Sequence, residues 1–97
     1  MNYALVCLLA RTSPTASAYA VETTARSISR LARRHLELCD MATSIPDDDG
    51  AIGTSLAAIE RRIGNAANAL NCTVRFETDP RGITVWVTGS EGTTVDV

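Results

Sequence analysis

Apolar residues recur with a helical period through much of the first half of the chain. Between Pro14 and about Met41 the spacings alternate between four and three, which produces one continuous stripe on a helix. The stripe consists of Val21, Ala25, Ile28, Ala32, His35 and Cys39, and Leu31, Leu36 and Leu38 widen it. Ser13 is a suitable N-cap and Pro14 a suitable first helical residue. We therefore predict one long helix beginning at Pro14.

Two further segments complete the helical part of the chain. Residues 54–70 carry a second apolar face, and Asn71 is suited to a left-handed C-cap after it. The run Tyr3–Ala10 is rich in Leu and Ala, which favours a helix, although its length leaves a strand open. Residues 42–53 are predicted to be a loop. Its three consecutive carboxylates, Asp47–Asp49, point in different directions and fit a solvated loop better than a calcium site.

After Asn71 the period changes from 3.6 to 2, which predicts strands over Cys72–Thr78 and Ile83–Thr88. Asp79–Gly82 has the composition of a type I turn, and Thr93–Val97 can add a short third strand. A four-residue loop keeps the apolar side chains on one face, whereas a bulged three-residue loop scatters them. The chosen register pairs Thr78 with Ile83, Phe76 with Val85, Val74 with Val87, Glu77 with Thr84 and Arg75 with Trp86.

These elements predict a single α+β domain over residues 1–97. Two long antiparallel helices, together with the short N-terminal helix or strand, pack on one face of a small C-terminal β-meander. The chain has 97 residues, of which 45% are hydrophobic, which suits one core and argues against disorder. No apolar stretch approaches the roughly 20 residues that a membrane span needs.

Charge adds a candidate binding surface. The formal net charge of −2 argues against a general, charge-driven nucleic-acid binder. All nine basic residues are arginine, whose planar guanidinium suits carboxylates and phosphates. Four of them lie within three turns of the first long helix, away from its apolar stripe: Arg26, Arg30, Arg33 and Arg34. We take this stripe as a candidate partner-binding site, with a solvated helix face as the alternative.

The predicted hairpin offers three more candidate binding residues. Arg75 and Trp86 are cross-strand neighbours on the face away from the apolar side chains, where they can form a cation–π pair. The alternative is that the first long helix covers this face and makes Trp86 a core residue. Arg81 lies at the hairpin tip, where it can contact a partner or be a solvated turn residue.

No complete catalytic motif is present, and we expect neither enzymatic activity nor a cofactor. Cys7, Cys39, Cys72 and His35 could in principle form a zinc site, but they lack paired ligand spacing. Cys39 and His35 could form a nucleophilic pair, but the sequence names no third orienting group. Reduced, buried thiols in a cytosolic protein are the simpler interpretation. The first two residues carry no Arg or Lys, so we expect no signal peptide.

The last 45 residues or so carry a resemblance. The stretches Ala57–Ile63, Ala69–Phe76 and Asp79–Gly82, with Val85, resemble a group of small phage and prophage proteins. Those proteins have an Arg-rich helix, a second helix of the form E-x-R-I…A-L-G, and a strand leading into D-P-R-G. Asn71 stands where they often have Gly, which changes only the helix cap.

The resemblance implies an accessory protein of a phage or mobile element, a class that includes inhibitors of host defences such as anti-CRISPR proteins. We therefore expect a non-enzymatic inhibitor in the host cytoplasm that binds a host protein complex, in the sharpest form a CRISPR effector. The alternative is a small nucleic-acid-binding phage regulator that uses the helix arginines, with Trp86 stacking on a base. A homodimer remains open.

Overall fold

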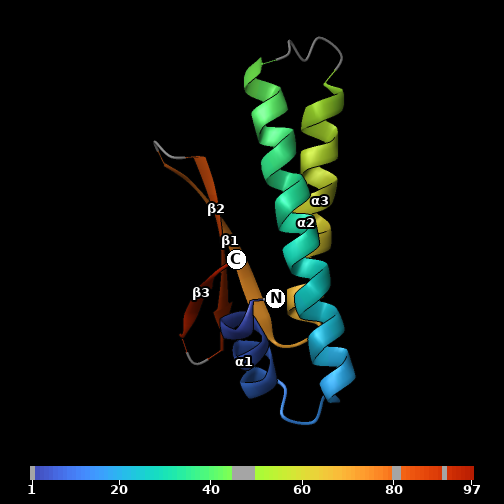
Figure 1. The fold of residues 1–97 in the computed structure, drawn as a ribbon, viewed down its shortest axis with the longest axis vertical. Helices are drawn as coiled ribbons and strands as arrows, with labels where there is room; N and C mark the ends of the chain where they lie inside the picture. The colour runs from blue at the N-terminus through green and yellow to red at the C-terminus, as the bar shows by residue number, and fades with distance from the viewer. Residues whose placement is uncertain (1, 45–49, 80–81, 91) are drawn as a thin grey trace.

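The computed structural model describes residues 2–44, 50–79, 82–90 and 92–97, and it has the predicted α+β architecture (Figure 1). Three helices come first, α1 (Tyr3–Thr12), α2 (Ala18–Ser44) and α3 (Ala51–Asn68). Three strands follow, β1 (Cys72–Asp79), β2 (Gly82–Gly89) and β3 (Thr94–Asp96). The strands form one antiparallel sheet in the order β1-β2-β3. The helices-then-meander prediction is confirmed.

The N-terminal apolar run is a helix, so the strand alternative is wrong. Asn2 caps α1, because its side-chain oxygen accepts the backbone N–H of Leu5 at 3.1 Å. Leu5, Leu8 and Leu9 are completely buried, and their spacing of three and four places them on one helical face. This burial against the rest of the domain stabilises a helix that is too short to be stable alone.

The predicted start of the long helix at Pro14 is wrong, because α2 begins at Ala18. The hydroxyl of Ser17 accepts the backbone N–H of Ala20 at 3.1 Å, as an N-cap residue does. Ser13 instead ends α1, since its N–H donates to the carbonyl of Leu9 at 3.1 Å. Both serines have capping chemistry, and the burial of Ser13 at the end of α1 leaves Ser17 to begin α2.

Helices α2 and α3 form an antiparallel pair. The C-terminal end of α2 and the N-terminal end of α3 extend beyond the sheet (Figure 1). Helix α3 begins at Ala51, three residues before the predicted Thr54, after Gly50 in a left-handed conformation with φ of 73°. Asn71 has φ of 63°, which confirms the predicted left-handed residue after this helix. The Asp47–Asp49 run, weighed above as a calcium site, lies outside the described residues.

The strand register is the predicted one. Val74 pairs with Val87, Phe76 with Val85, and Arg75 lies opposite Trp86. The ladder continues to Asp79 opposite Gly82, so the connection is shorter than the four-residue loop predicted, without a change of register. The predicted third strand is present as β3 and pairs with β2.

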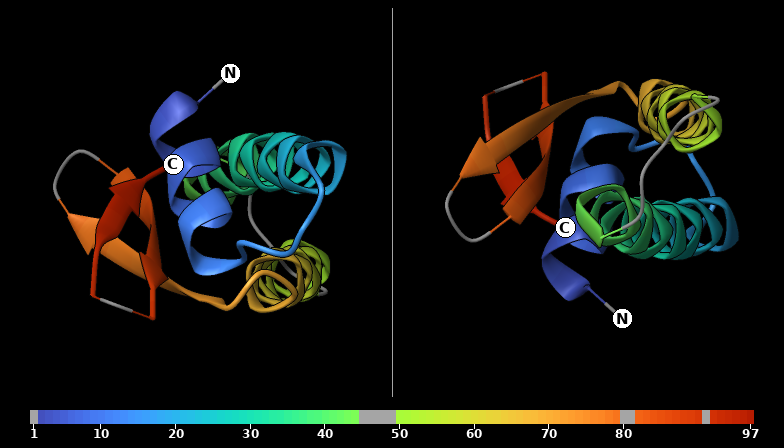
Figure 2. Two further views of the ribbon diagram at one scale, coloured as in Figure 1. Left: turned by 90° about the horizontal axis from the view of Figure 1, so that it is seen from below. Right: turned by 90° about the horizontal axis from the view of Figure 1, so that it is seen from above.

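The apolar face of the sheet packs on the helices. Seen along the long axis, α1 lies between the sheet and the α2–α3 pair (Figure 2). Val85 and Val87 of β2 are buried with Ile28 of α2 and Ile63 of α3 in one core. Gly89 packs closely against α1: a Cβ there would lie 2.8 Å from Thr12 Cγ2 and 2.9 Å from Leu8 Cδ1.

Candidate functional site

All four α2 arginines of the predicted stripe are exposed. Three of them, at spacings of four and three, line a shallow hollow of about 230 Å³ together with Ser29, and we call this surface the arginine face: Arg26, Ser29, Arg30 and Arg33. Within the described residues its three guanidinium groups form no ion pair. Arg34, in contrast, pairs with Glu37 through Nη1 and Oε2 at 3.2 Å.

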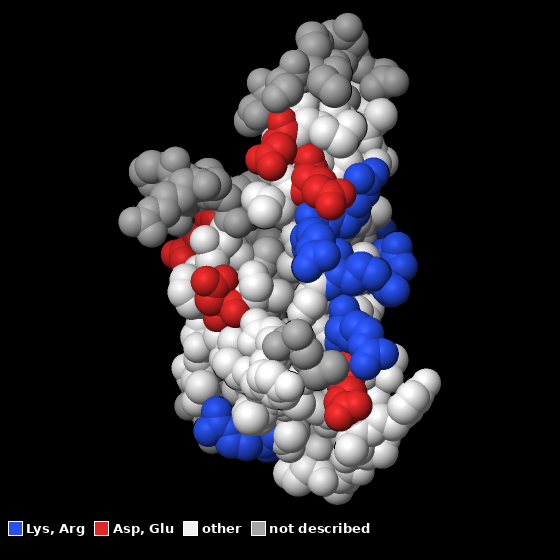
Figure 3. All heavy atoms as spheres, viewed as in Figure 1, with Lys and Arg blue, Asp and Glu red and all other residues white. Residues whose placement is uncertain are grey.

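The arginine face is a continuous cationic strip on the surface. Basic side chains gather along α2, with acidic side chains near both ends of the strip (Figure 3). Because the arginines there are exposed and have no acidic partner in the described structure, they retain donors and charge for a carboxylate or phosphate. The strip is therefore available to a partner without any internal ion pair having to break.

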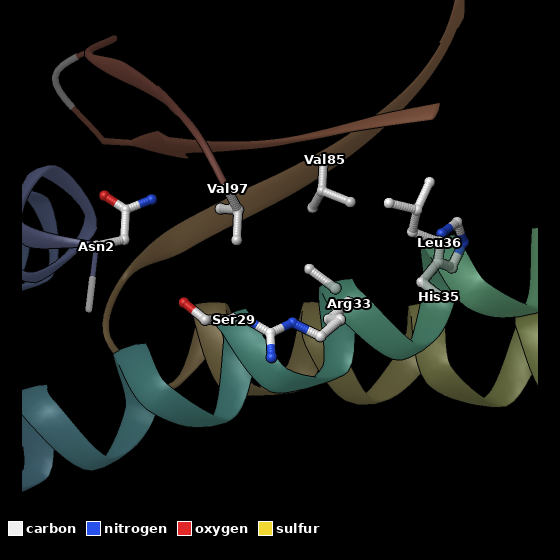
Figure 4. A pocket seen from close by; sticks show the side chains of 8 residues that line it. Asn2, Ser29, Arg33, His35, Leu36, Val85 and Val97 are labelled. Carbon is white, nitrogen blue, oxygen red and sulfur yellow. The ribbon is translucent and has the colours of Figure 1, made fainter. Parts of the chain in front are cut away.

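Beside the arginine face lies a second hollow of about 380 Å³ between α2 and the sheet. We call it the apolar hollow, and it is lined by Asn2, Ser29, Ala32, Arg33, His35, Leu36, Val85 and Val97. In Figure 4, Val85 and Val97 point from the sheet towards α2, while Arg33 extends along the helix below them. Ser29 and Arg33 line both hollows, so the two form one continuous surface.

Leu36 corrects one sequence expectation. We expected it to widen the buried stripe of α2, yet it is 45% exposed at the edge of the apolar hollow. The β1–β2 hairpin diverges from α2 towards its turn, so the sheet does not cover this part of the helix (Figure 1). A half-exposed Leu next to an unpaired Arg is a surface feature that helical periodicity alone does not reveal.

His35 is a core residue at the junction of α2, α3 and β1, as its place on the apolar stripe predicts. The residue is 2% exposed, and its ring stacks on Phe76 with the centroids 4.9 Å apart. Nε2 lies 3.5 Å from Glu60 Oε1, and Nδ1 lies 3.8 Å from Cys39 Sγ. Both ring nitrogens therefore have internal partners, and the ring contributes packing to the apolar hollow.

Glu60 supplies the third group that the sequence could not name beside Cys39 and His35. The order of thiol, imidazole and carboxylate resembles that of a cysteine nucleophile with an oriented base. Burial raises the pKa of the Cys39 thiol above its ordinary value, and the negative charges of Glu60 and Asp40 raise it further. A raised pKa disfavours the thiolate, so this environment opposes the activation that nucleophilic catalysis needs.

The cysteines and His35 do not converge on a metal site. The expectation of buried thiols is wrong for Cys7, which is exposed on α1. Cys39 is partly buried on α2, and Cys72 is buried at the start of β1. In the part of the chain that the structure describes, no group of three or more His, Cys, Asp or Glu side chains could hold a metal ion. Cys72 contacts Thr12, whose Oγ1 lies 3.3 Å from Sγ.

Thiol alkylation is expected to follow exposure and thiolate content. In the native protein at about pH 8, Cys7 should react fastest with iodoacetamide and Cys72 slowest, because only the exposed thiolate reacts. The raised pKa of Cys39 reduces its thiolate at that pH, so its rate should approach that of Cys7 only at higher pH. A mass-spectrometric time course measures all three rates. Fastest reaction at Cys39 would contradict this and indicate an activated nucleophile.

The second group of predicted binding residues lies on the other face of the sheet. Trp86 alternates with the buried Val85 and Val87, so it faces away from the helices, and the alternative of a helix covering it is wrong. Arg75 does not stack on Trp86 but pairs with Glu77 through Nη2 and Oε2 at 3.6 Å. Arg81 lies outside the described residues.

Trp86 is partly buried among its neighbours on this open face. Its Nε1 atom is buried and has no hydrogen-bond partner among the described residues. The sheet separates this indole from the α2 arginines. A single ligand therefore cannot use the arginine face and Trp86 as adjacent contacts.

Comparison with other proteins adds no assignment, since no family model, curated protein or solved structure matches this chain significantly. None of the helices in the described segments combines the length and the apolar character needed to cross a membrane. The site's chemistry therefore has to be interpreted from its own residues.

Proposed function

We propose that this chain is a small non-enzymatic inhibitor that occupies an acidic surface of a partner protein with the arginines of α2. The observation that carries the proposal is that Arg26, Arg30 and Arg33 share one exposed face and form no ion pair within the described residues. Guanidinium groups in this arrangement form charge-assisted, often bidentate, hydrogen bonds with carboxylates. Arginine is also among the residues enriched at interface hot spots.

In its sharpest form, the partner is a host defence complex and the chain is a phage-encoded blocker of the anti-CRISPR type that acts in the host cytoplasm. This form rests on the resemblance of the α3 and hairpin sequences to phage accessory proteins. That the chain belongs to this group is itself part of the proposal. The α2 arginines supply the chemistry by which such a blocker would compete for an acidic patch.

A nucleic-acid regulator is the competing function. It would need the arginine face for phosphates and Trp86 for base stacking, but Trp86 alternates with the buried Val85 and Val87 and so lies on the face of the sheet away from α2. The net charge of −2 also repels a polyanion beyond the local reach of the arginines. A protein partner with a local acidic patch requires neither the indole nor a positive overall field.

Affinity capture tests the class of partner. The immobilised chain is incubated with host lysate, untreated or nuclease-treated, at low and high salt, and labelled duplex DNA is titrated separately. We expect one protein complex to be retained in stoichiometric amounts after nuclease treatment and to be released as salt screens the arginine contacts. Loss of all retained protein with nuclease, together with tight DNA binding that falls steeply with salt, would assign the chain to the nucleic-acid class instead.

A further inference from the structure

The surface of α2 combines two chemistries that meet at shared residues. Ser29 and Arg33 line both the arginine face and the apolar hollow. On one side of Arg33 lie the guanidinium groups of Arg26 and Arg30, and on the other lie the side chains of Leu36 and Val85. A ligand that lies along this part of α2 therefore contacts both positive charge and apolar surface.

Aliphatic side chains line the apolar hollow from both sides, together with the polar residues Asn2, Ser29, Arg33 and His35. Val85 and Val97 point into it from the sheet, and Leu36 borders it from α2 (Figure 4). The polar groups of Asn2 are engaged elsewhere, since its amide donates to the carbonyl of Asp96 at 3.1 Å and its oxygen caps α1. His35 directs its nitrogens to Glu60 and Cys39. Arg33 is thus the charged group that the hollow offers to a ligand.

The volume of the hollow indicates the size of its occupant. About 380 Å³ lies near the lower end of the range of small-ligand pockets, which is roughly 300–1,000 Å³. A single large apolar side chain of a partner fits within this volume. Such a side chain would be an anchor residue of the kind that dominates interface energy.

From this juxtaposition we infer that the combined surface binds an acidic peptide segment of the partner that carries one large apolar anchor. The anchor enters the apolar hollow against Leu36, Val85 and Val97, and carboxylates on its flank pair with Arg33 and then with Arg30 and Arg26. Charge complementarity selects this occupant, because Arg33 makes the hollow cationic on the side of the arginine face, while Leu36, Val85 and Val97 offer it aliphatic surface. The inference rests on the proposed function and specifies what the partner presents.

The apolar contact and the charged contact predict different specificities. The arginines alone would accept any acidic surface, whereas the hollow selects a segment with an apolar residue at a fixed distance from its carboxylates. Removing apolar surface at Leu36 should therefore weaken anchored segments and leave purely acidic ones unaffected. Reversing the charge at Arg33 should weaken both kinds of segment.

A displayed random-peptide library, selected on the immobilised full-length chain, tests the inference. The wild type should enrich peptides in which acidic residues flank a large apolar residue. Leu36→Asp and Arg33→Glu should each reduce recovery of these peptides by roughly tenfold or more, as loss of an interface hot spot does. The matched controls are Met41→Asp, at another exposed apolar residue of α2, and Arg62→Glu, at an exposed arginine of α3, and both should retain recovery.

Each other outcome overturns the inference. The first is that no family of peptides is enriched. The second is that the enriched peptides are acidic, lack an apolar anchor and are recovered equally well by Leu36→Asp. The third is that the enriched peptides are apolar and are recovered equally well by Arg33→Glu. A single-stranded oligonucleotide can also be tested as a competitor of the selected peptides. If it competes with them on the wild type and on Leu36→Asp but no longer binds Arg33→Glu, the surface binds nucleic acid. If Leu36→Asp lowers the melting temperature, Leu36→Gln, which keeps a similar length, replaces it.

Failure of the inference and failure of the proposed function are distinguishable. Acidic peptides without an anchor would still agree with a protein partner captured through the arginine face. If no protein is captured from lysate but anchored acidic peptides are enriched, the α2 surface binds such peptides and the proposed inhibitor function fails. The peptide selection therefore reports on the α2 surface independently of the partner's identity.

Discussion

Replacing Arg30 and Arg33 together with alanine is expected to abolish partner binding while the domain keeps its stability. Both side chains are exposed and form no ion pair in the described structure, so each substitution should change the free energy of unfolding by no more than about 0.5 kcal/mol. Alanine is also a good helix former. Loss of a paired interfacial arginine weakens binding by roughly 2 kcal/mol or more, which is about thirtyfold in the dissociation constant.

The measurement compares the dissociation constant and the melting temperature of the double variant with those of the wild type. Arg61→Ala with Arg62→Ala is the matched control, because it removes two exposed arginines from α3 and leaves the arginine face intact. Full binding by the Arg30/Arg33 variant would make the α2 arginines a solvated face and direct attention to Arg75 and Trp86. Unfolding of the variant would show that the buried face of α2 is assigned incorrectly.

Gly89→Ala is expected to destabilise the domain by overpacking the contact between β2 and α1. The added Cβ would lie within 3 Å of Thr12 Cγ2 and Leu8 Cδ1. Leu8 is completely buried, and Thr12 is held by a 2.7 Å hydrogen bond from its Oγ1 to the carbonyl of Leu70, so neither side chain moves freely. Overpacking of this kind destabilises by about 1–3 kcal/mol.

Gly64→Ala is the matched control, and its effect on the free energy of unfolding is expected to have the opposite sign. Gly64 lies inside α3, and a Cβ there meets nothing within 4 Å. Alanine in a helix interior is more favourable than glycine by roughly 0.5–1 kcal/mol, so this variant should gain stability. Chemical denaturation of both variants gives the two free energies of unfolding. A stabilised Gly89→Ala would contradict the close packing of α1 against β2.

The register of the sheet was predictable because neighbouring residues in the sequence determine it. Alternation of Val74 and Phe76 with polar residues fixes which side chains share a face, and the turn sequence fixes the pairing of β1 with β2. The start of α2 was not predictable in the same way. Ser13 and Ser17 both have capping chemistry, and the tertiary contacts of Ser13, which is buried and accepts a hydrogen bond from Asn71 Nδ2 at 3.1 Å, are not encoded in the local sequence.

The candidate site was predictable only in its charged half. The spacing of the α2 arginines places three of them on one face in any helix. The apolar hollow depends on Val97 and Val85, which reach α2 only through the tertiary packing of the sheet. The contact of Glu60 with His35 likewise depends on how α3 is positioned along α2, which no local pattern encodes.

The site of contact with the partner tests the central claim most directly. In the complex of the isotope-labelled chain with the captured partner, NMR signals of the arginine Nε–Hε groups report which guanidinium groups are engaged. We predict large shifts for Arg26, Arg30 and Arg33, with Arg62 and the Trp86 indole unchanged. Shifts at Trp86 and Arg75, with the α2 arginines unchanged, would contradict it and assign binding to the open face of the sheet.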